Sequence, residues 1–296
     1  MRILIVLLTR SAVVLFLLLA AVGSAFCRDL AEIKADGVLR HIGIPYANFV
    51  TGSDDGMDVE LIKGFAKHIG VRYEYVRSDW GTVVGDLLGK KVRLENGQAV
   101  LGEDVPVKGD LIANGFTMLP WRQQILNFST PTFPSQIWFI ARAGSSIRPI
   151  KPTKLAKDIE RVRHSMKGKN VLALPKTCLD PSLYNLEATG ATVVCFSGNL
   201  NELAPALVNR EAETTILDVP DALIALDKWP GKIKIIGPLS PPQLMGVGFA
   251  KNSPRLRDAF NTYFNETKRN GTYARLIKKY YPTAHIYFPD FFRNIK

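Results

Sequence analysis

Residues 56–76 read "GMDVELIKGFAKHIGVRYEYV", and this stretch decides the fold class. Its first part carries apolar residues at the spacing of one helix face, namely Val59, Ile62, Phe65, Ala66 and Ile69. Asp58 lies near the expected helix start, where a carboxylate suits the helix dipole, and Gly70 is typical of a helix end. The next residues alternate like a strand. Together with a strand predicted over residues 38–44, the stretch forms a strand–helix–strand unit, which implies a parallel sheet.

A second unit of the same kind follows later in the chain. We expect strands at "NVLALP" (170–175) and "ATVVCF" (191–196), with a helix across "PSLYNLEAT" (181–189) between them. A further strand is expected at 214–219, and two short strands around a proline pair at 233–250. Two such units predict two α/β lobes. The predicted boundaries are 29–133 with 243–296 for lobe one and 134–242 for lobe two, joined by two crossing strands.

The first 25 residues have the composition of an export signal. Arg2 and Arg10 precede the apolar run "AVVLFLLLAAV" (12–22), which is shorter than the ~20 residues that a membrane span requires. The small residues "GSA" (23–25) follow it, so we expect cleavage near Ala25 and an exported protein. An uncleaved anchor is the alternative.

The chain carries a formal net charge of +11. Its basic residues are dispersed, and no nucleic-acid reading motif accompanies them. The charge therefore favours a solvated basic surface, and we expect no nucleic acid partner.

Three cysteines are present, and export permits a disulfide. Cys178 follows one predicted strand and Cys195 lies near the end of the next, so parallel neighbouring strands would bring the two together. We therefore expect them to pair. Cys27 is left over, and Phe26 before it disfavours lipid attachment.

Residues 91–109 have the pattern of an inserted hairpin. Asn96-Gly97 between alternating apolar residues is a strong hairpin signal. Two interpretations stay open: the hairpin is a lid over a cleft, or it is an insertion without a functional role. The second is the simpler interpretation.

No catalytic, metal, nucleotide or cofactor motif is recognisable, so we expect a non-enzymatic protein that needs no cofactor. Polar residues instead follow the predicted strands: Trp80, Thr117, Arg122, Thr177 and Asp218. Ligands of open α/β sheets bind beyond the carboxyl ends of strands. A guanidinium binds a carboxylate through paired hydrogen bonds, a carboxylate binds an ammonium, and helix amides after Thr177 would add anion affinity. This set would hold an α-amino acid.

At these residues the chain resembles the extracellular solute-binding proteins of family 3, the polar amino-acid receptors of ABC importers. The resemblance rests on five stretches in the family's order: "DGVLRHIGIPYANF" (36–49), "GMDVELIKGFAKHIGV" (56–71), "DLIANGFTMLPWRQQILNFSTPTF" (110–133), "LDVPDAL" (217–223) and "NGTYARLIKKYY" (270–281). It implies a type II periplasmic-binding-protein fold whose two lobes close on a ligand. The ending "AHIYFPDFF" (284–292) also resembles the binding-type domain of a membrane-bound lytic transglycosylase.

The resemblance also implies roles for individual residues. Arg122 falls on the arginine that binds the ligand carboxylate, with Gly115 and Thr117 beside it. Asp218 falls on the amine-binding acid. Trp80, and less strongly Tyr46, fall on the aromatic residue that packs on the ligand side chain, and Thr177 falls on the loop of the second lobe.

The chain also departs from the family pattern at the expected site. Leu119 stands where the family usually has Thr, and Lys176 stands in the Gly-Thr loop. Alternative roles stay open for three residues: Arg122 as a surface ion-pair partner, Asp218 as a helix cap, and Trp80 as ordinary core.

We expect a monomeric periplasmic receptor that binds a small amino acid or related carboxylate and delivers this ligand to an ABC permease. A ligand sensor for a membrane partner and a dehydratase-like enzyme are the alternatives from other functional classes.

Overall fold

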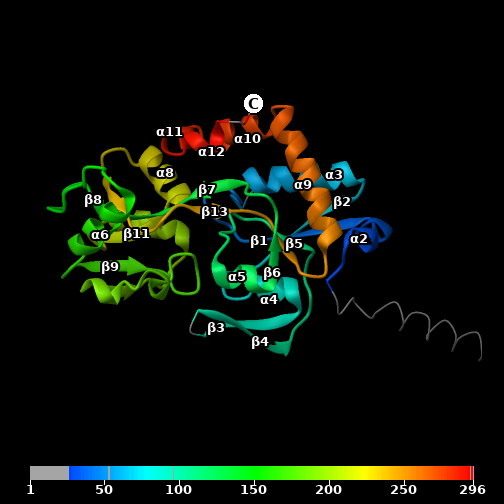
Figure 1. Cartoon of the computed structure of the whole chain (residues 1–296), viewed down its shortest axis with the longest axis horizontal. Coiled ribbons are helices and arrows are strands. Elements are labelled where there is room, and N and C mark those ends of the chain that lie inside the picture. The colour runs from blue at the N-terminus through cyan, green and yellow to red at the C-terminus, as the bar shows by residue number, and fades with distance from the viewer. Residues whose placement is uncertain (1–26, 53, 96, 294, 296) are drawn as a thin grey trace, which may run out of the picture.

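The computed structural model describes residues 27–52, 54–95, 97–293 and 295. The expected signal segment, residues 1–25, lies outside them. Figure 1 shows two groups of strands, one on each side of a central junction. None of the helices in the described ranges has the length and apolar character that a membrane crossing requires.

The first sheet has five strands in the order β2-β1-β5-β14-β6. Their bounds are β1 Val38–Gly43, β2 Arg72–Arg77, β5 Leu111–Ile112, β6 Leu126–Phe128 and β14 Gly248–Ala250. The predicted strand–helix–strand unit is confirmed, because β1 pairs with β2 in parallel and α3 (Met57–Ile69) connects them. The α3 helix ends at Gly70, which has φ +79°, and it buries Ile62 and Phe65 as the spacing predicts.

Further helices belong to the same part of the chain as this sheet. They are α2 (Leu30–Asp36), α4 (Val83–Leu88), α5 (Pro120–Ile125), α9 (Pro254–Arg269) and α10 (Thr272–Tyr280). The α9 and α10 helices are separated at Asn270-Gly271. Arg28 donates to Asp110 through Nε at 2.9 Å and through a terminal nitrogen at 2.6 Å, which joins the start of the described chain to the sheet.

The second sheet also has five strands, in the order β10-β9-β11-β8-β12. Their bounds are β8 Ile137–Arg142, β9 Asn170–Ala173, β10 Thr192–Cys195, β11 Thr214–Asp218 and β12 Ile233–Pro238. The expected parallel pair is confirmed, with Cys195 opposite Ala173. The helices of this part are α6 (Leu155–Ser165), α7 (Leu203–Val208), preceded by a 3₁₀ turn η3 (Leu200–Glu202), and α8 (Val219–Lys228).

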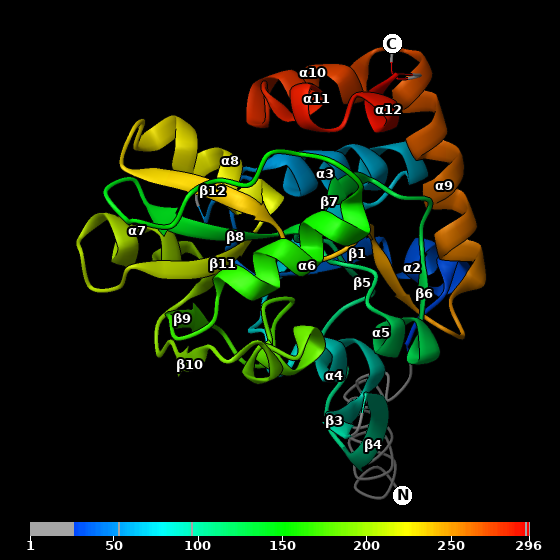
Figure 2. The ribbon, with the colours of Figure 1, turned by 60° about the vertical axis from the view of Figure 1, so that its left-hand side comes forward.

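Three local predictions differ from the structure. The helix expected over 181–189 is two 3₁₀ turns, η1 (Pro181–Tyr184) and η2 (Glu187–Thr189), because the backbone of Asn185 turns left-handed at φ +46°. The α6 helix was not predicted; Figure 2 shows it lying in front of the second sheet. Residues 233–250 contain three strands, not two, because β13 (Gln243–Met245) lies between β12 and β14.

Two antiparallel strands, β7 (Phe133–Ser135) and β13, connect the sheets. Above this junction in Figure 1 lie α11 (Ala284–Tyr287) and α12 (Pro289–Phe292). Tyr287 packs on Trp138 with ring centres 5.4 Å apart, and Phe292 packs on Phe133 at 5.9 Å. The C-terminal segment therefore contacts both the second sheet and a connecting strand.

The predicted hairpin is also confirmed. Strands β3 (Lys90–Glu95) and β4 (Gln98–Asp104) pair in antiparallel register and project from the lower side of the molecule in Figure 1. Asn96 of its turn lies outside the described residues, and Gly97 has φ +76°.

Candidate functional site

Arg122 is one of the largest fully buried side chains among the described residues, with 1% of its surface exposed. It lies on α5, whose start is set by Pro120 in the first turn, a position that proline favours. One terminal nitrogen donates to the backbone oxygen of Thr117 at 3.0 Å, and Nε is buried without a hydrogen-bond partner in the described part of the chain. The interpretation of Arg122 as a surface residue is therefore wrong.

Two aromatic rings flank this guanidinium. Its central carbon lies 4.1 Å from the ring centre of Phe116 and 5.3 Å from that of Trp121. Burial lowers the pKa of Arg122 from 12.5 to about 10, and no ion pair with a carboxylate is formed among the described residues. A buried guanidinium without a paired carboxylate is suited to bind an anion.

Gly115 and Thr117 hold the backbone beside Arg122. Gly115 has φ +64°, and an added Cβ would lie 2.3 Å from a ring carbon of Phe49, so only glycine fits. The Gly115 amide donates to Asp58 at 2.7 Å. Burial raises the pKa of Asp58 to about 7, although that hydrogen bond lowers it. Sequence reasoning assigned Asp58 to the helix dipole and missed this link to the site.

Asp218 lies at the end of β11 and is 1% exposed. It occupies the N-cap position of α8 without a side-chain hydrogen bond of full capping geometry, while the backbone amides of Asp221 and Asp218 lower the pKa of its carboxyl. The Tyr46 hydroxyl and the Cys178 thiol both donate to its carboxylate, the latter over 3.6 Å. Burial raises the pKa of Asp218 to about 6, while the hydrogen bond from Tyr46 opposes that rise.

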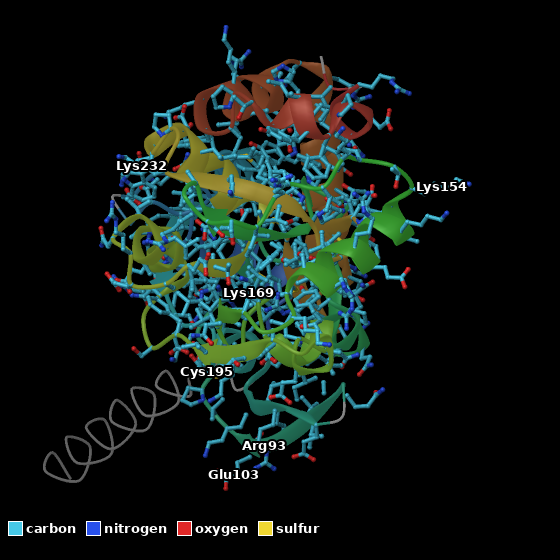
Figure 3. The ribbon with its side chains drawn as sticks, turned by 90° about the vertical axis from the view of Figure 1, so that its left-hand side faces the viewer. Arg93, Glu103, Lys154, Lys169, Cys195 and Lys232 are labelled. Carbon is cyan, nitrogen blue, oxygen red and sulfur yellow. The ribbon has the colours of Figure 1, made fainter. Side chains whose placement is uncertain are left out.

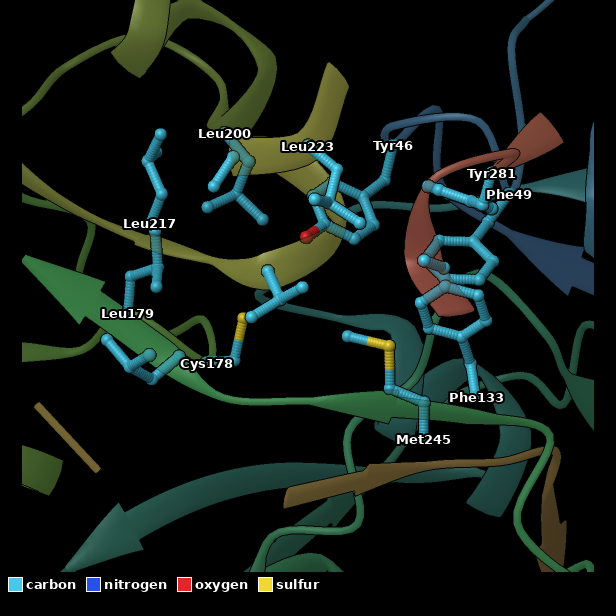
Figure 4. Close-up of a cluster of buried hydrophobic side chains, with 14 of the residues drawn as sticks. Tyr46, Phe49, Phe133, Cys178, Leu179, Leu200, Leu217, Leu223, Met245 and Tyr281 are labelled. Atoms are coloured by element: carbon cyan, nitrogen blue, oxygen red, sulfur yellow. The ribbon is translucent and has the colours of Figure 1, made fainter. Parts of the chain in front are cut away.

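Tyr46 comes from the first-sheet side and reaches Asp218 on the second-sheet side, 172 residues away in the chain. Figure 4 shows its ring between Phe49 on one side and Leu200 and Leu217 on the other. All of these side chains belong to one buried cluster. The two sheets therefore meet through Tyr46, and Asp218 and Arg122 lie inside a closed junction.

Asp221 is a further acid that sequence reasoning missed. It is 7% exposed, and its Oδ2 is buried with no partner among the described residues. Burial, followed by repulsion from Asp218, raises the pKa of Asp221 well above its ordinary value. Its place three residues after Asp218 in "LDVPDAL" was the available signal.

A cavity of about 410 Å³ lies near these groups, which do not line it; its wall residues Trp121 and Trp80 contact Arg122 and Tyr46. Trp80 and Trp121 line it from the first-sheet side, and Thr177 and Leu183 line it from the second-sheet side. Trp80 packs edge-on against Tyr46, with ring centres 5.5 Å apart. Trp80 is therefore half-buried at a cavity wall rather than sealed in the core.

Thr177 stands at this cavity but its hydroxyl is already engaged. It donates to the Leu174 oxygen at 2.7 Å and accepts from the Leu179 amide at 3.0 Å. The expected helix after Thr177 is absent, because a 3₁₀ turn replaces it. The prediction of a full helix N-terminus here is therefore wrong. No group of metal-ligating side chains occurs in the part of the chain that the structure describes.

The predicted disulfide is also wrong, because Cys178 and Cys195 are both free thiols. Lys176 turns the chain left-handed at φ +65° after β9, and Cys178 then points to Asp218 on the other neighbour of β9. Cys195 lies exposed on the edge strand, as Figure 3 shows. The half-buried Cys27 is free too and donates to the Leu87 oxygen at 3.0 Å.

Comparison with known proteins gives one family and several relatives. The family model described as bacterial extracellular solute-binding proteins, family 3, matches residues 107–283, more than half of the chain. A histidine-binding periplasmic protein of Salmonella typhimurium is 24% identical over 76% of this chain and 78% of that protein. Membrane-bound lytic murein transglycosylase F of Desulfosudis oleivorans is 26% identical over 76% of this chain, but the match spans only 44% of its own length.

Solved structures agree on the fold. A mutant of the arginine-binding protein ArgBP from T. maritima has a TM-score of 0.67 at 24% identity, covering 86% of this chain and 99% of that one. The ancestral amino acid-binding protein AncCDT-1, described as a precursor of cyclohexadienyl dehydratase, has a TM-score of 0.65 at 21% identity, covering 85% and 98%.

Proposed function

Because the chain belongs to the bacterial extracellular solute-binding proteins of family 3, we propose that it captures a small amino acid or related carboxylate between its two sheets. Its fold is the type II periplasmic-binding-protein fold. The observation that carries the proposal is the state of Arg122: a fully buried guanidinium with an unpartnered Nε and no carboxylate in an ion pair with it among the described residues. A ligand carboxylate would satisfy that charge.

Asp218 complements Arg122 for a zwitterionic ligand. Its carboxylate is buried and now accepts from Tyr46 and Cys178, two uncharged donors. A ligand ammonium would replace the Tyr46 hydroxyl with a charged donor, and a charge-assisted hydrogen bond is about twice as strong as a neutral one. Trp80 and Tyr46 would then pack against the ligand side chain.

Capture requires the junction to open, since both charged groups are buried. We assign the two moving lobes to residues 29–133 with 243–296 and to residues 134–242, with β7 and β13 as the hinge. The proposed receptor is exported, works as a monomer, and presents its closed form to an ABC permease. This function is binding without turnover.

The test is a thermal-shift screen of the purified protein with the twenty amino acids and small carboxylates, followed by calorimetry on any ligand that raises Tm. A ligand at 100 times its Kd should stabilise the native state by about 2.7 kcal/mol. The proposal also requires Arg122→Met to abolish that shift. A ligand that binds wild type and this variant equally would refute the site. Turnover of a bound cyclic acid would refute the binding-only assignment, and ATPase stimulation of a reconstituted permease would test delivery.

A further inference from the structure

The inserted hairpin β3–β4 presents an apolar face although it projects into solvent. Val92 pairs with Leu101, and Leu94 pairs with Ala99, directly across the two strands. Residues that face each other across an antiparallel pair lie on the same side of it. Val92, Leu94, Ala99 and Leu101 therefore form one side of the hairpin. Leu94 is 37% exposed and Leu101 is 50% exposed.

Part of this face lines the cavity beside the candidate site. Val92 and Leu94 contribute to its wall together with Trp80 and Trp121, while Leu183 faces them from the second-sheet side. Val92, Trp80 and Trp121 are partly buried and pack against the smaller buried cluster of the first-sheet side. Leu101 does not line this cavity. The cavity is therefore walled mainly by apolar and aromatic side chains from both sides of the junction.

Three charged residues, Arg93, Lys176 and Asp180, also line the cavity. Arg93 is exposed and lies 3.6 Å from Glu95, and Lys176 is exposed. The Asp180 carboxylate accepts from the Lys176 amide at 2.8 Å and the Ser182 amide at 3.0 Å. An anionic ligand group placed here would meet the cations of Arg93 and Lys176, whereas an apolar group would cover Leu94 and both tryptophans.

Arg122 and Asp218 do not line this cavity, but two of its wall residues connect it to the groups proposed to hold the ligand's charged ends. Trp121 contacts the Arg122 guanidinium, and Trp80 contacts Tyr46, which donates to Asp218. A bound amino acid with its carboxylate on Arg122 and its ammonium on Asp218 would thus direct its side chain toward these two tryptophans.

We infer that the hairpin is a wall of the ligand chamber and makes the protein selective for an amino acid with a large apolar or aromatic side chain. This inference rests on the proposed function. Covering a partly exposed leucine and the adjoining tryptophan surface gains on the order of 25 cal/mol per Å² of apolar area. Affinity should therefore rise with the apolar size of the ligand side chain.

The experiment measures Kd by calorimetry for L-alanine, L-leucine and L-phenylalanine with wild type, Leu94→Ser and Leu101→Ser. Leu101→Ser is the matched control, because it makes the same change on the same hairpin face outside the cavity. Wild type should bind phenylalanine and leucine at least tenfold more tightly than alanine. Leu94→Ser should weaken phenylalanine binding by on the order of tenfold and leave alanine unchanged. Leu101→Ser should change neither. Circular dichroism confirms that each variant is folded.

Three other outcomes contradict the inference. If alanine binds as tightly as phenylalanine, the inference fails and the proposed function stands. Equal effects of the two serine variants also overturn the inference. If none of the three amino acids binds wild type, the inference fails, and the thermal-shift screen decides separately whether the proposed function stands.

Discussion

Replacing Arg122 by methionine should stabilise the ligand-free protein and, at the same time, remove amino-acid binding. The guanidinium is fully buried between Phe116 and Trp121 without a carboxylate partner among the described residues. A methionine side chain has a similar length and packs well against aromatic rings. The variant therefore removes an unpaired buried charge and keeps most of the packing.

The magnitude follows from the shifted pKa of Arg122. Burial lowers it from 12.5 to about 10. At about 1.4 kcal/mol for each pKa unit, the closed form disfavours this charge by about 3 kcal/mol. The variant also loses the hydrogen bond to the Thr117 oxygen, which reduces the gain in stability by about 1 kcal/mol. The expected net gain is about 2 kcal/mol, or a Tm rise of about 5 °C.

Urea unfolding and calorimetry of the same samples check both halves of this prediction. Arg122→Lys is the control, because it keeps a buried cation and should give no gain in stability. The reasoning is refuted if Arg122→Met loses about 2 kcal/mol or more of stability while it still binds ligand. That result would mark Arg122 as a structural residue whose charge the native state already satisfies.

Three further predictions concern the acids and the thiols. Asp218→Asn should weaken amino-acid binding at least 30-fold in calorimetry, because it removes the charge opposite the ammonium; an unchanged Kd would contradict that role. The pKa of Asp58 is raised to about 7, so the native state holds this proton more tightly than the unfolded state does. Stability should therefore fall by up to about 4 kcal/mol as pH rises from about 4 to 7, and Asp58→Asn should flatten that dependence in urea titrations at pH 5 and 7.5; parallel curves would contradict it. In thiol titration of the native protein, Cys195 should react at once and Cys178 only after unfolding, whereas no reaction at either cysteine would restore the disulfide.

Several features of this fold could be predicted because their causes are local. The spacing of Ile62 and Phe65 produces an amphipathic helix wherever that segment lies, and Gly70 permits the left-handed turn that ends it. The hairpin turn at 96–97 places Leu94 opposite Ala99 without help from the rest of the chain. The order of strands and helices then implied two parallel-sheet units.

The amino-acid sequence by itself thus determined many of the secondary elements, one parallel strand pair in each sheet and the family pattern around Arg122. Only the tertiary structure decided what the side chains contact, because these contacts join segments that are distant in sequence. The Tyr46–Asp218 hydrogen bond spans 172 residues. The direction of Cys178 depends on one left-handed residue, Lys176, and this turn brings its thiol to Asp218 instead of Cys195. Strand spacing places a residue at a sheet edge, but loop dihedrals and packing decide where its side chain points.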